Sequence, residues 1–296
     1  MTLPPLPVTV IAGYLGAGKT SLVNHLLRNP GGRRLMVMVN DFGELNIDAE
    51  LLESADEDTL TLSNGCICCT MGTELLYALG DAIDRRPRPD HLVIEASGVA
   101  QPEKIAAAAH AEPEMRYAGI VTVADAANIG ALTSDAKIGA QITGQLSVAD
   151  LVALTKTDIG GDVLGLLRGL TKAPIIEAPM GAIDPMLVLG PTSPQTPGAG
   201  HAHDHGADYA QWSARGGIVN REALKAFLKV PPSGLYRFKG VFRFTDGKGG
   251  EAHIVGSTHD LSAAEATETT AVAIGVSDAF DTAEMARAWE ALLVEG

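Results

Sequence analysis

The sequence predicts an α/β fold, with a mostly parallel sheet flanked by helices and a smaller α+β domain at the C-terminal end. Short, almost continuously apolar runs alternate with helical patterns over the first part of the chain, as a sheet covered on both faces requires. After a stretch rich in Pro, Gly and His, the pattern changes to alternating strands. We therefore expect domains at residues 1–190 and 218–296, joined by a linker at residues 191–217.

The expected elements follow from apolar periodicity and from helix-end signals. Buried strands are predicted at 8–13, 34–41, 90–97, 118–125, 149–156 and 173–178, with a helix at 20–29. In the second domain, Asn220 is expected to cap a helix that runs through Leu228. Three strands are expected next, at "LYRFKGVFRFT" (235–245), "EAHIVGS" and "TAVAIGV". The last helix is predicted at 282–294, where Asp281 and Glu284 have capping-box spacing.

Composition and charge exclude several functional classes. The chain has 296 residues and a formal net charge of −14, so we expect it to repel nucleic acid and anionic membrane surfaces. Neither a signal peptide nor an apolar stretch of spanning length is predicted. With no export signal and three clustered cysteines, a reducing cytoplasm is the expected location.

A phosphate-binding loop is predicted at "GYLGAGKT" (13–20), which matches G-x-x-x-x-G-K-[ST] between a predicted strand and a predicted helix. Its glycines let backbone N–H groups point at phosphate oxygens, and the helix N-terminus adds partial positive charge. Lys19 is expected to neutralise the β- and γ-phosphates, and the Thr20 hydroxyl to bind Mg²⁺. The alternative is a glycine-rich turn with a stray lysine. The expected nucleotide-binding residues here are Gly13, Gly16, Ala17, Gly18, Lys19, Thr20 and Ser21.

The nucleotide base is expected to be guanine. "LVALTKTD" ends a predicted strand with Thr155, Lys156 and Asp158, which resembles the N/T-K-x-D motif of GTPases. An aspartate there accepts hydrogen bonds from guanine, and the lysine stem packs over the base. Adenine would leave this buried acceptor unpaired. The motif is short, and a solvated loop at the end of a strand is the alternative.

A second carboxylate is predicted at the magnesium site. The apolar strand in "LVIEASG" ends at Glu95, and Gly98 follows three residues later in an E-x-x-G pattern. A carboxylate at this strand end can hold Mg²⁺ through water, and the Gly98 N–H can meet the γ-phosphate. Lys19, Thr20, Glu95 and Gly98 are therefore the candidate catalytic residues.

All three cysteines lie within "SNGCICCTM" (63–71), at Cys66, Cys68 and Cys69. Three thiols this close cannot all pair, and the backbone between them is too short for relaxed disulfide geometry. As thiolates they supply three soft ligands, which suit Zn²⁺ or Co²⁺ in a tetrahedral site with one position open. The alternative is three inert cysteines.

The motifs "GYLGAGKT", "VNDFGELNID", "NGCICCT", "IEASGVAQP" and "TKTD" occur in the order seen in the CobW-type GTPases. The sequence from "LYRFKGVFRF" to "TAVAIG" resembles the second domain of that family. The resemblance implies a P-loop GTPase fold and a metallochaperone that hydrolyses GTP and passes a transition metal to a client enzyme or cofactor pathway.

Three further features bear on this resemblance. Family members usually read N-E-F-G-E where this chain has Asp41 in place of the first glutamate and keeps Glu44, a possible metal ligand. Asn40 to Glu44 is expected to change conformation with the γ-phosphate and so reshape the thiolate site. His201, His203 and His205 resemble the histidine-rich stretches of the family and can capture metal, with a solvated linker as the alternative.

Three functions are compatible with these patterns. The first is a GTPase that delivers metal to a client. Its intrinsic hydrolysis rate is expected to be slow, because neither an arginine finger nor a water-orienting glutamine accompanies E-x-x-G. The second is a P-loop kinase for a small molecule, which the GTPase-type T-K-x-D motif disfavours. The third is a metal-sensing or storage module in which nucleotide only stabilises the fold. The sequence leaves the oligomeric state, the metal and the client open.

Overall fold

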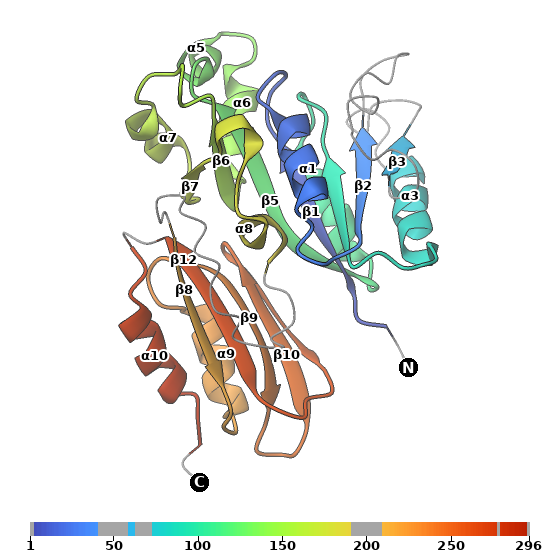
Figure 1. Ribbon diagram of the computed structural model, residues 1–296, viewed down its shortest axis with the longest axis vertical. Coiled ribbons are helices and arrows are strands. Elements are labelled where there is room, and N and C mark those ends of the chain that lie inside the picture. The colour runs from blue at the N-terminus through green and yellow to red at the C-terminus, as the bar shows by residue number, and fades with distance from the viewer. Residues whose placement is uncertain (1–2, 41–58, 63–72, 191–208, 277–278, 295–296) are drawn as a thin grey trace. The chain divides into compact units, whose positions relative to one another are not determined.

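The computed structural model describes residues 3–40, 59–62, 73–190, 209–276 and 279–294. These residues divide into two compact units, residues 1–189 and 190–296 (Figure 1). The prediction of a parallel α/β domain and a smaller α+β domain is confirmed.

In the part of the first unit that the structure describes, there are seven strands with helices between them. In chain order these are β1 (Leu6–Ala12), α1 (Lys19–Arg28), β2 (Leu35–Asn40), β3 (Thr59–Leu62), α3 (Thr73–Asp84), β4 (His91–Glu95), α4 (Pro102–Ala111), β5 (Met115–Asp125), α5 (Ile129–Ser134), α6 (Gly139–Ser147), β6 (Leu151–Thr155), α7 (Leu164–Leu170), β7 (Ile175–Glu177), the 3₁₀ turn η1 (Pro179–Gly181) and α8 (Pro185–Leu189).

The strands of this unit form one parallel sheet in the order β3-β2-β4-β1-β5-β6-β7. Strand order therefore reverses direction at β1, the point where ligands bind in sheets of this kind. The carboxyl ends of β1, β4 and β6 reach the same edge, which brings together the loops that follow them. The six predicted strands of this unit are all present, and β3 is one that the sequence pattern did not predict.

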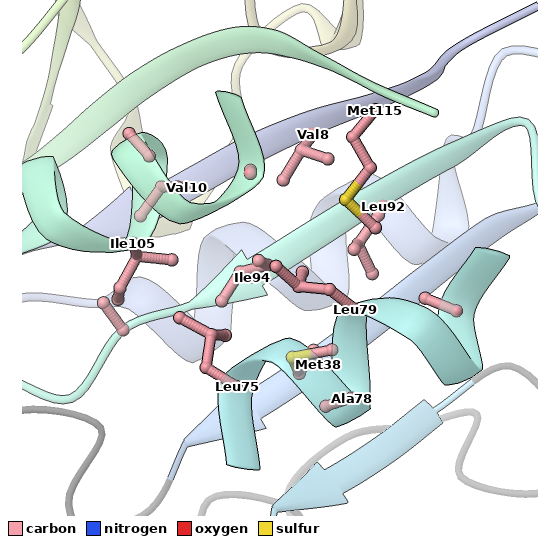
Figure 2. Packing of buried hydrophobic residues seen from close by; sticks show 14 of the residues in the cluster. Val8, Val10, Met38, Leu75, Ala78, Leu79, Leu92, Ile94, Ile105 and Met115 are labelled. Atoms are coloured by element: carbon pink, nitrogen blue, oxygen red, sulfur yellow. The ribbon is translucent and has the colours of Figure 1, made fainter. Parts of the chain in front are cut away.

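Apolar side chains of α3 and α4 pack against β1, β2 and β4 on one face of the sheet (Figure 2). Because side chains alternate along a strand, the neighbour of Val8 and Val10 in β1, Thr9, faces the other side. There the Thr9 hydroxyl donates to Val188 O of α8 at 3.2 Å. The sheet is thus covered on both faces, which explains why its strands are almost continuously apolar.

The described residues of the second unit form an antiparallel sheet with two helices. Its elements are β8 (Tyr209–Arg215), α9 (Arg221–Lys229), β9 (Leu235–Arg243), β10 (Gly249–Val255), β11 (Thr258–Ala263), β12 (Thr270–Val276) and α10 (Thr282–Glu290), and the sheet order is β11-β10-β9-β12-β8. Both helices pack into one aromatic core, where Phe227 of α9 lies 5.0 Å from Phe238 and Trp289 of α10 lies 5.5 Å from Trp212 between ring centroids.

Asn220 and Asp281 are the N-cap residues of the two helices in this unit, as predicted. The Asn220 side chain accepts hydrogen bonds from the N–H groups of Glu222 and Ala223, and Asp281 accepts one from Ala283. These bonds satisfy backbone donors that a helix start leaves without partners. The second helix ends at Glu290, four residues before the predicted end at 294.

The linker prediction at 191–217 was wrong for residues 209–215, which form β8. Residues 191–208 of the predicted linker lie outside the described residues. In β8, Ala210, Trp212 and Ala214 alternate with polar residues and pack against the core, so the strand buries one face only. The polar residues between them made this segment resemble the preceding Pro- and Gly-rich stretch.

Candidate nucleotide site

The phosphate-binding loop connects β1 to α1, as predicted. Gly13, Gly16 and Gly18 all have positive φ, at 136°, 74° and 102°. A side chain at Gly13 would place its Cβ 2.4 Å from the carbonyl oxygen of Val123, so only glycine fits between the loop and β5. The loop then ends at Gly18, the N-cap of α1. This conformation presents consecutive backbone N–H groups and a helix N-terminus, which together favour a phosphate.

Lys19 and Thr20 occupy the first turn of α1. Lys19 is buried, with 7% of its surface exposed. The Thr20 hydroxyl donates to Oε1 of Glu95 at 3.2 Å. Glu95 ends β4 directly beside β1, where it pairs with Ile11, and is 2% exposed. A hydroxyl and a carboxylate so placed are hard oxygen donors of the kind that Mg²⁺ prefers, so these residues fit the ion.

The E-x-x-G turn that follows Glu95 lies against the phosphate-binding loop. A Cβ at Gly98 would approach the backbone nitrogen of Leu15 to 2.7 Å, so the two loops are in direct contact. Gln145 of α6 stabilises this turn, because its Nε2 donates to Gly98 O at 3.1 Å and to Ala100 O at 2.9 Å. Sequence reasoning missed Gln145, since nothing in a helical pattern marks one buried amide as a loop support.

The T-K-x-D segment is hydrogen-bonded to the same loop, although about half the chain separates them. The Thr155 hydroxyl donates to Ala17 O at 2.7 Å, and Nζ of Lys156 donates to Gly16 O at 2.9 Å. Lys156 adopts a left-handed conformation, with φ 55°, as it leaves β6. The structure therefore brings two sequence-predicted motifs into one site.

Asp125 completes this connection and was not predicted as a site residue. It ends β5 and its Oδ2 lies 2.7 Å from Nζ of Lys156. Burial alone would raise the pKa of the Asp125 carboxyl. Hydrogen bonds from Lys156, Asn128 and the Ala127 N–H, with the charge of Lys156, nevertheless hold that pKa below its ordinary value of 3.8. The usable signal was its place at the carboxyl end of a parallel strand beside β6.

Asp158, the last residue of the motif, is exposed at the surface of the loop that follows β6. Gly160, two residues later, would place a Cβ 2.6 Å from Ala126, so the loop packs closely on the turn after β5. This contact positions the loop while the carboxylate of Asp158 remains accessible. An accessible carboxylate next to a phosphate loop can accept hydrogen bonds from a bound base.

Several predicted site residues lie outside the described residues. These are Cys66, Cys68, Cys69, Asp41, Glu44, His201, His203 and His205. In the ranges that are described, no group of three His, Cys, Asp or Glu side chains is close enough to hold a metal ion. None of the helices in these ranges combines the length and apolar character that a bilayer crossing requires.

Family models match both units of the chain. The nucleotide-binding domain of CobW/HypB/UreG matches residues 7–173, and the C-terminal domain of the cobalamin synthesis protein CobW matches residues 212–293. The first match alone covers more than half of the chain. The chain belongs to the CobW/HypB/UreG family. The family nucleotide-binding domain thus includes the phosphate-binding loop and the T-K-x-D segment, and a CobW C-terminal domain follows it.

The chain is also similar to individual proteins. The chain is 34% identical over 221 residues to the zinc chaperone CobW of Sinorhizobium sp., covering 62% of either chain. It is 35% identical over 192 residues to the zinc chaperone YjiA of Escherichia coli, covering 61% of this chain and 59% of the relative. The match thus spans about three fifths of these relatives' lengths. The crystal structure of Zn(II)-bound YjiA GTPase from E. coli aligns over 99% of this chain and 100% of that chain, with 22% identity and a TM-score of 0.48.

Proposed function

We propose that this member of the CobW/HypB/UreG family hydrolyses GTP and uses hydrolysis to deliver a transition metal from Cys66, Cys68 and Cys69 to a client. The observation that carries the proposal is the pair of hydrogen bonds from Thr155 and Lys156 to the phosphate-binding loop. They hold the T-K-x-D segment against the phosphate-binding loop, which supports a single nucleotide site formed by both segments.

Guanine fits this site better than adenine. The exposed carboxylate of Asp158 accepts hydrogen bonds from the N1–H and the exocyclic amine of guanine. Adenine has no proton on N1 and carries its amine at another ring position, so it would leave the carboxylate without donors. The methylene stem of Lys156 is fixed by its bonds to Gly16 O and Asp125 and can pack over the base.

Hydrolysis needs charge neutralisation and a positioned γ-phosphate. Lys19 would neutralise the β- and γ-phosphates, Thr20 and Glu95 would hold Mg²⁺, and the Gly98 N–H would meet the γ-phosphate. Magnesium, when bound, would supply positive charge that offsets the negative charge of the phosphates. Gln145 lies next to Gly98, but its amide nitrogen already donates to two carbonyls, so it supports the turn and does not orient water. We therefore expect a slow intrinsic rate.

The metal proposal is supported by the thiol chemistry and by the relatives. Three thiolates suit zinc or cobalt, and two relatives of this chain are named zinc chaperones, which favours zinc. A site with three protein ligands and one open coordination position suits a metal that must be released to another protein. The client would be a metalloprotein or an enzyme of cofactor biosynthesis. Delivery would take place in a reducing cytoplasm, where the cysteines stay thiols.

One experiment tests both halves of the proposal. Wild type, Lys19→Ala and Cys68→Ala are purified in reducing buffer, and zinc content, GTP binding and GTP turnover are measured on each. We expect Lys19→Ala to lose turnover and keep zinc, and Cys68→Ala to lose zinc and keep GTP binding. If zinc content is the same in all three proteins, the cysteines do not hold the metal. If wild type converts no GTP to GDP at any metal load, the enzyme proposal fails.

A further inference from the structure

Met180 is the most exposed of the large apolar side chains in the described residues, with 88% of its surface accessible. It also has a left-handed backbone, φ 54° and ψ 22°, within the turn η1. A non-glycine residue adopts this conformation only at an energetic cost. The fold thus holds an apolar side chain in solvent, on a strained backbone, where glycine or asparagine would suit the conformation better.

The turn that carries Met180 lies between helix α1, which follows the phosphate-binding loop, and strand β6, which leads into the T-K-x-D segment. A Cβ at the next residue, Gly181, would lie 2.7 Å from both the Ser21 carbonyl carbon and the Leu22 nitrogen, so η1 rests on the first turn of α1. On its other side, Ala178 N donates to Leu154 O at 2.7 Å, one residue before Thr155. Met180 is therefore held at the sheet edge that carries both Lys19 and the T-K-x-D segment.

This edge also carries other exposed apolar side chains. Leu15 of the phosphate-binding loop is 62% exposed, and Ile159, next to Asp158, is 71% exposed. A purine base has a polar edge and two apolar faces, and burying those faces against apolar side chains is favourable. In the proposed site the phosphates and the polar base edge already have partners. The Lys156 stem covers one face of the base in that proposal, and the other face still requires an apolar contact.

We propose that the Met180 side chain packs against the purine base of the bound nucleotide and contributes to base affinity. The inference rests on the proposed function, since it requires a nucleotide at this site. Residues with a strained backbone cluster at ligand-binding sites, and a flexible thioether adapts well to a flat aromatic surface. The contact acts on the base and leaves phosphate binding unchanged.

Three substitutions at this position separate the side chain from the backbone. Met180→Gly and Met180→Asn accept the left-handed conformation without an apolar side chain, whereas Met180→Leu keeps the apolar group. We expect the Kd for GDP to rise about tenfold in the Gly and Asn variants, the change that loss of one buried apolar contact produces. Met180→Leu should stay within about threefold of wild type. The melting temperatures of the Gly and Asn variants should not fall, because their backbone strain is relieved.

A second ligand separates base contact from a general effect on the site. Tripolyphosphate contains no base, so its affinity should be the same for wild type and all three Met180 variants. Val230→Ala is the matched control, because Val230 is 81% exposed and lies in the second unit. It should change neither affinity.

The outcomes distinguish the inference from the function on which it rests. If wild type binds GDP and the Gly and Asn variants bind it equally well, Met180 does not touch the base, and the nucleotide proposal stands. If these variants lose tripolyphosphate affinity as strongly as GDP affinity, Met180 acts through the shape of the site, which also overturns the inference. If wild type binds no guanine nucleotide, both proposals fail together.

Discussion

At the scale of single residues, we expect Asp158 to decide which base the proposed site accepts. Replacing its carboxylate by the amide in Asp158→Asn turns one acceptor oxygen into a donor. Guanine then meets a mismatched group, whereas xanthine, with a carbonyl in place of the exocyclic amine, gains a partner. We expect GTP affinity to fall by about a hundredfold and xanthosine triphosphate affinity to rise. Competition against a fluorescent GDP measures both; an unchanged GTP affinity would remove Asp158 from the base site.

The ion pair between Lys156 and Asp125 leads to a prediction about pH. Because folding lowers the pKa of Asp125 below 3.8, its stabilisation is complete above that value. It is lost as the pH falls through the lower pKa of the folded state. Asp125→Asn should therefore reduce the unfolding free energy by about 2 kcal/mol at neutral pH. The difference between the two proteins should shrink as the pH falls below 3.8 and through the lowered pKa of the folded state.

Urea unfolding of wild type and Asp125→Asn across this pH range measures the difference. Asp135→Asn is a suitable control, because Asp135 accepts only backbone N–H bonds at an exposed position. A difference that stays constant between neutral and acidic pH would show that the charge of Asp125 does not contribute. Turnover should also fall in Asp125→Asn, since Lys156 then holds Gly16 O less firmly.

At the scale of elements, helix α3 offers a matched pair of leucines. Leu79 is 2% exposed and lies in the core cluster of the first unit (Figure 2), while Leu76 of the same helix is 53% exposed. Leu79→Ala should lower the unfolding free energy by about 3 kcal/mol, because it leaves a cavity. Leu76→Ala should change it by less than about 0.5 kcal/mol. Equal losses in chemical denaturation would mean that α3 does not pack on the sheet through Leu79.

Most elements of the fold could be predicted from the sequence, and the exceptions have physical reasons. Strands covered on both faces are continuously apolar, so β1, β4, β5 and β6 were recognised directly. The edge strand β11 has exposed residues at nearly every position, so it lacks an apolar signal. Strand β8 buries only every second residue, and these alternate with polar ones.

At the scale of the whole molecule, the site is formed by segments far apart in the chain. The motifs at 13–20, 95–98 and 155–158 were predictable, because each has its own sequence pattern. Their supports, Asp125 and Gln145, were not, because their roles depend on which strands and helices become neighbours. Sequence patterns identify groups that contact a ligand more readily than groups that hold those groups in place.

The proposed coupling between nucleotide and metal also belongs to the whole molecule. The segment that starts at Asn40, at the end of β2, and the cysteines beyond it follow strands of the same sheet as the phosphate-binding loop. Residues 41–58 and 63–72 themselves lie outside the described residues. A γ-phosphate that moves this segment would change how firmly three thiolates hold zinc.

Zinc affinity in the two nucleotide states tests this claim most directly. Competition with a chromogenic chelator gives the zinc Kd of the protein saturated with a non-hydrolysable GTP analogue and of the protein saturated with GDP. If hydrolysis releases the metal, the GDP complex should bind zinc more weakly by about tenfold. Cys68→Ala should bind weakly in both states. Equal zinc affinities in the two nucleotide states of wild type would contradict delivery driven by GTP hydrolysis.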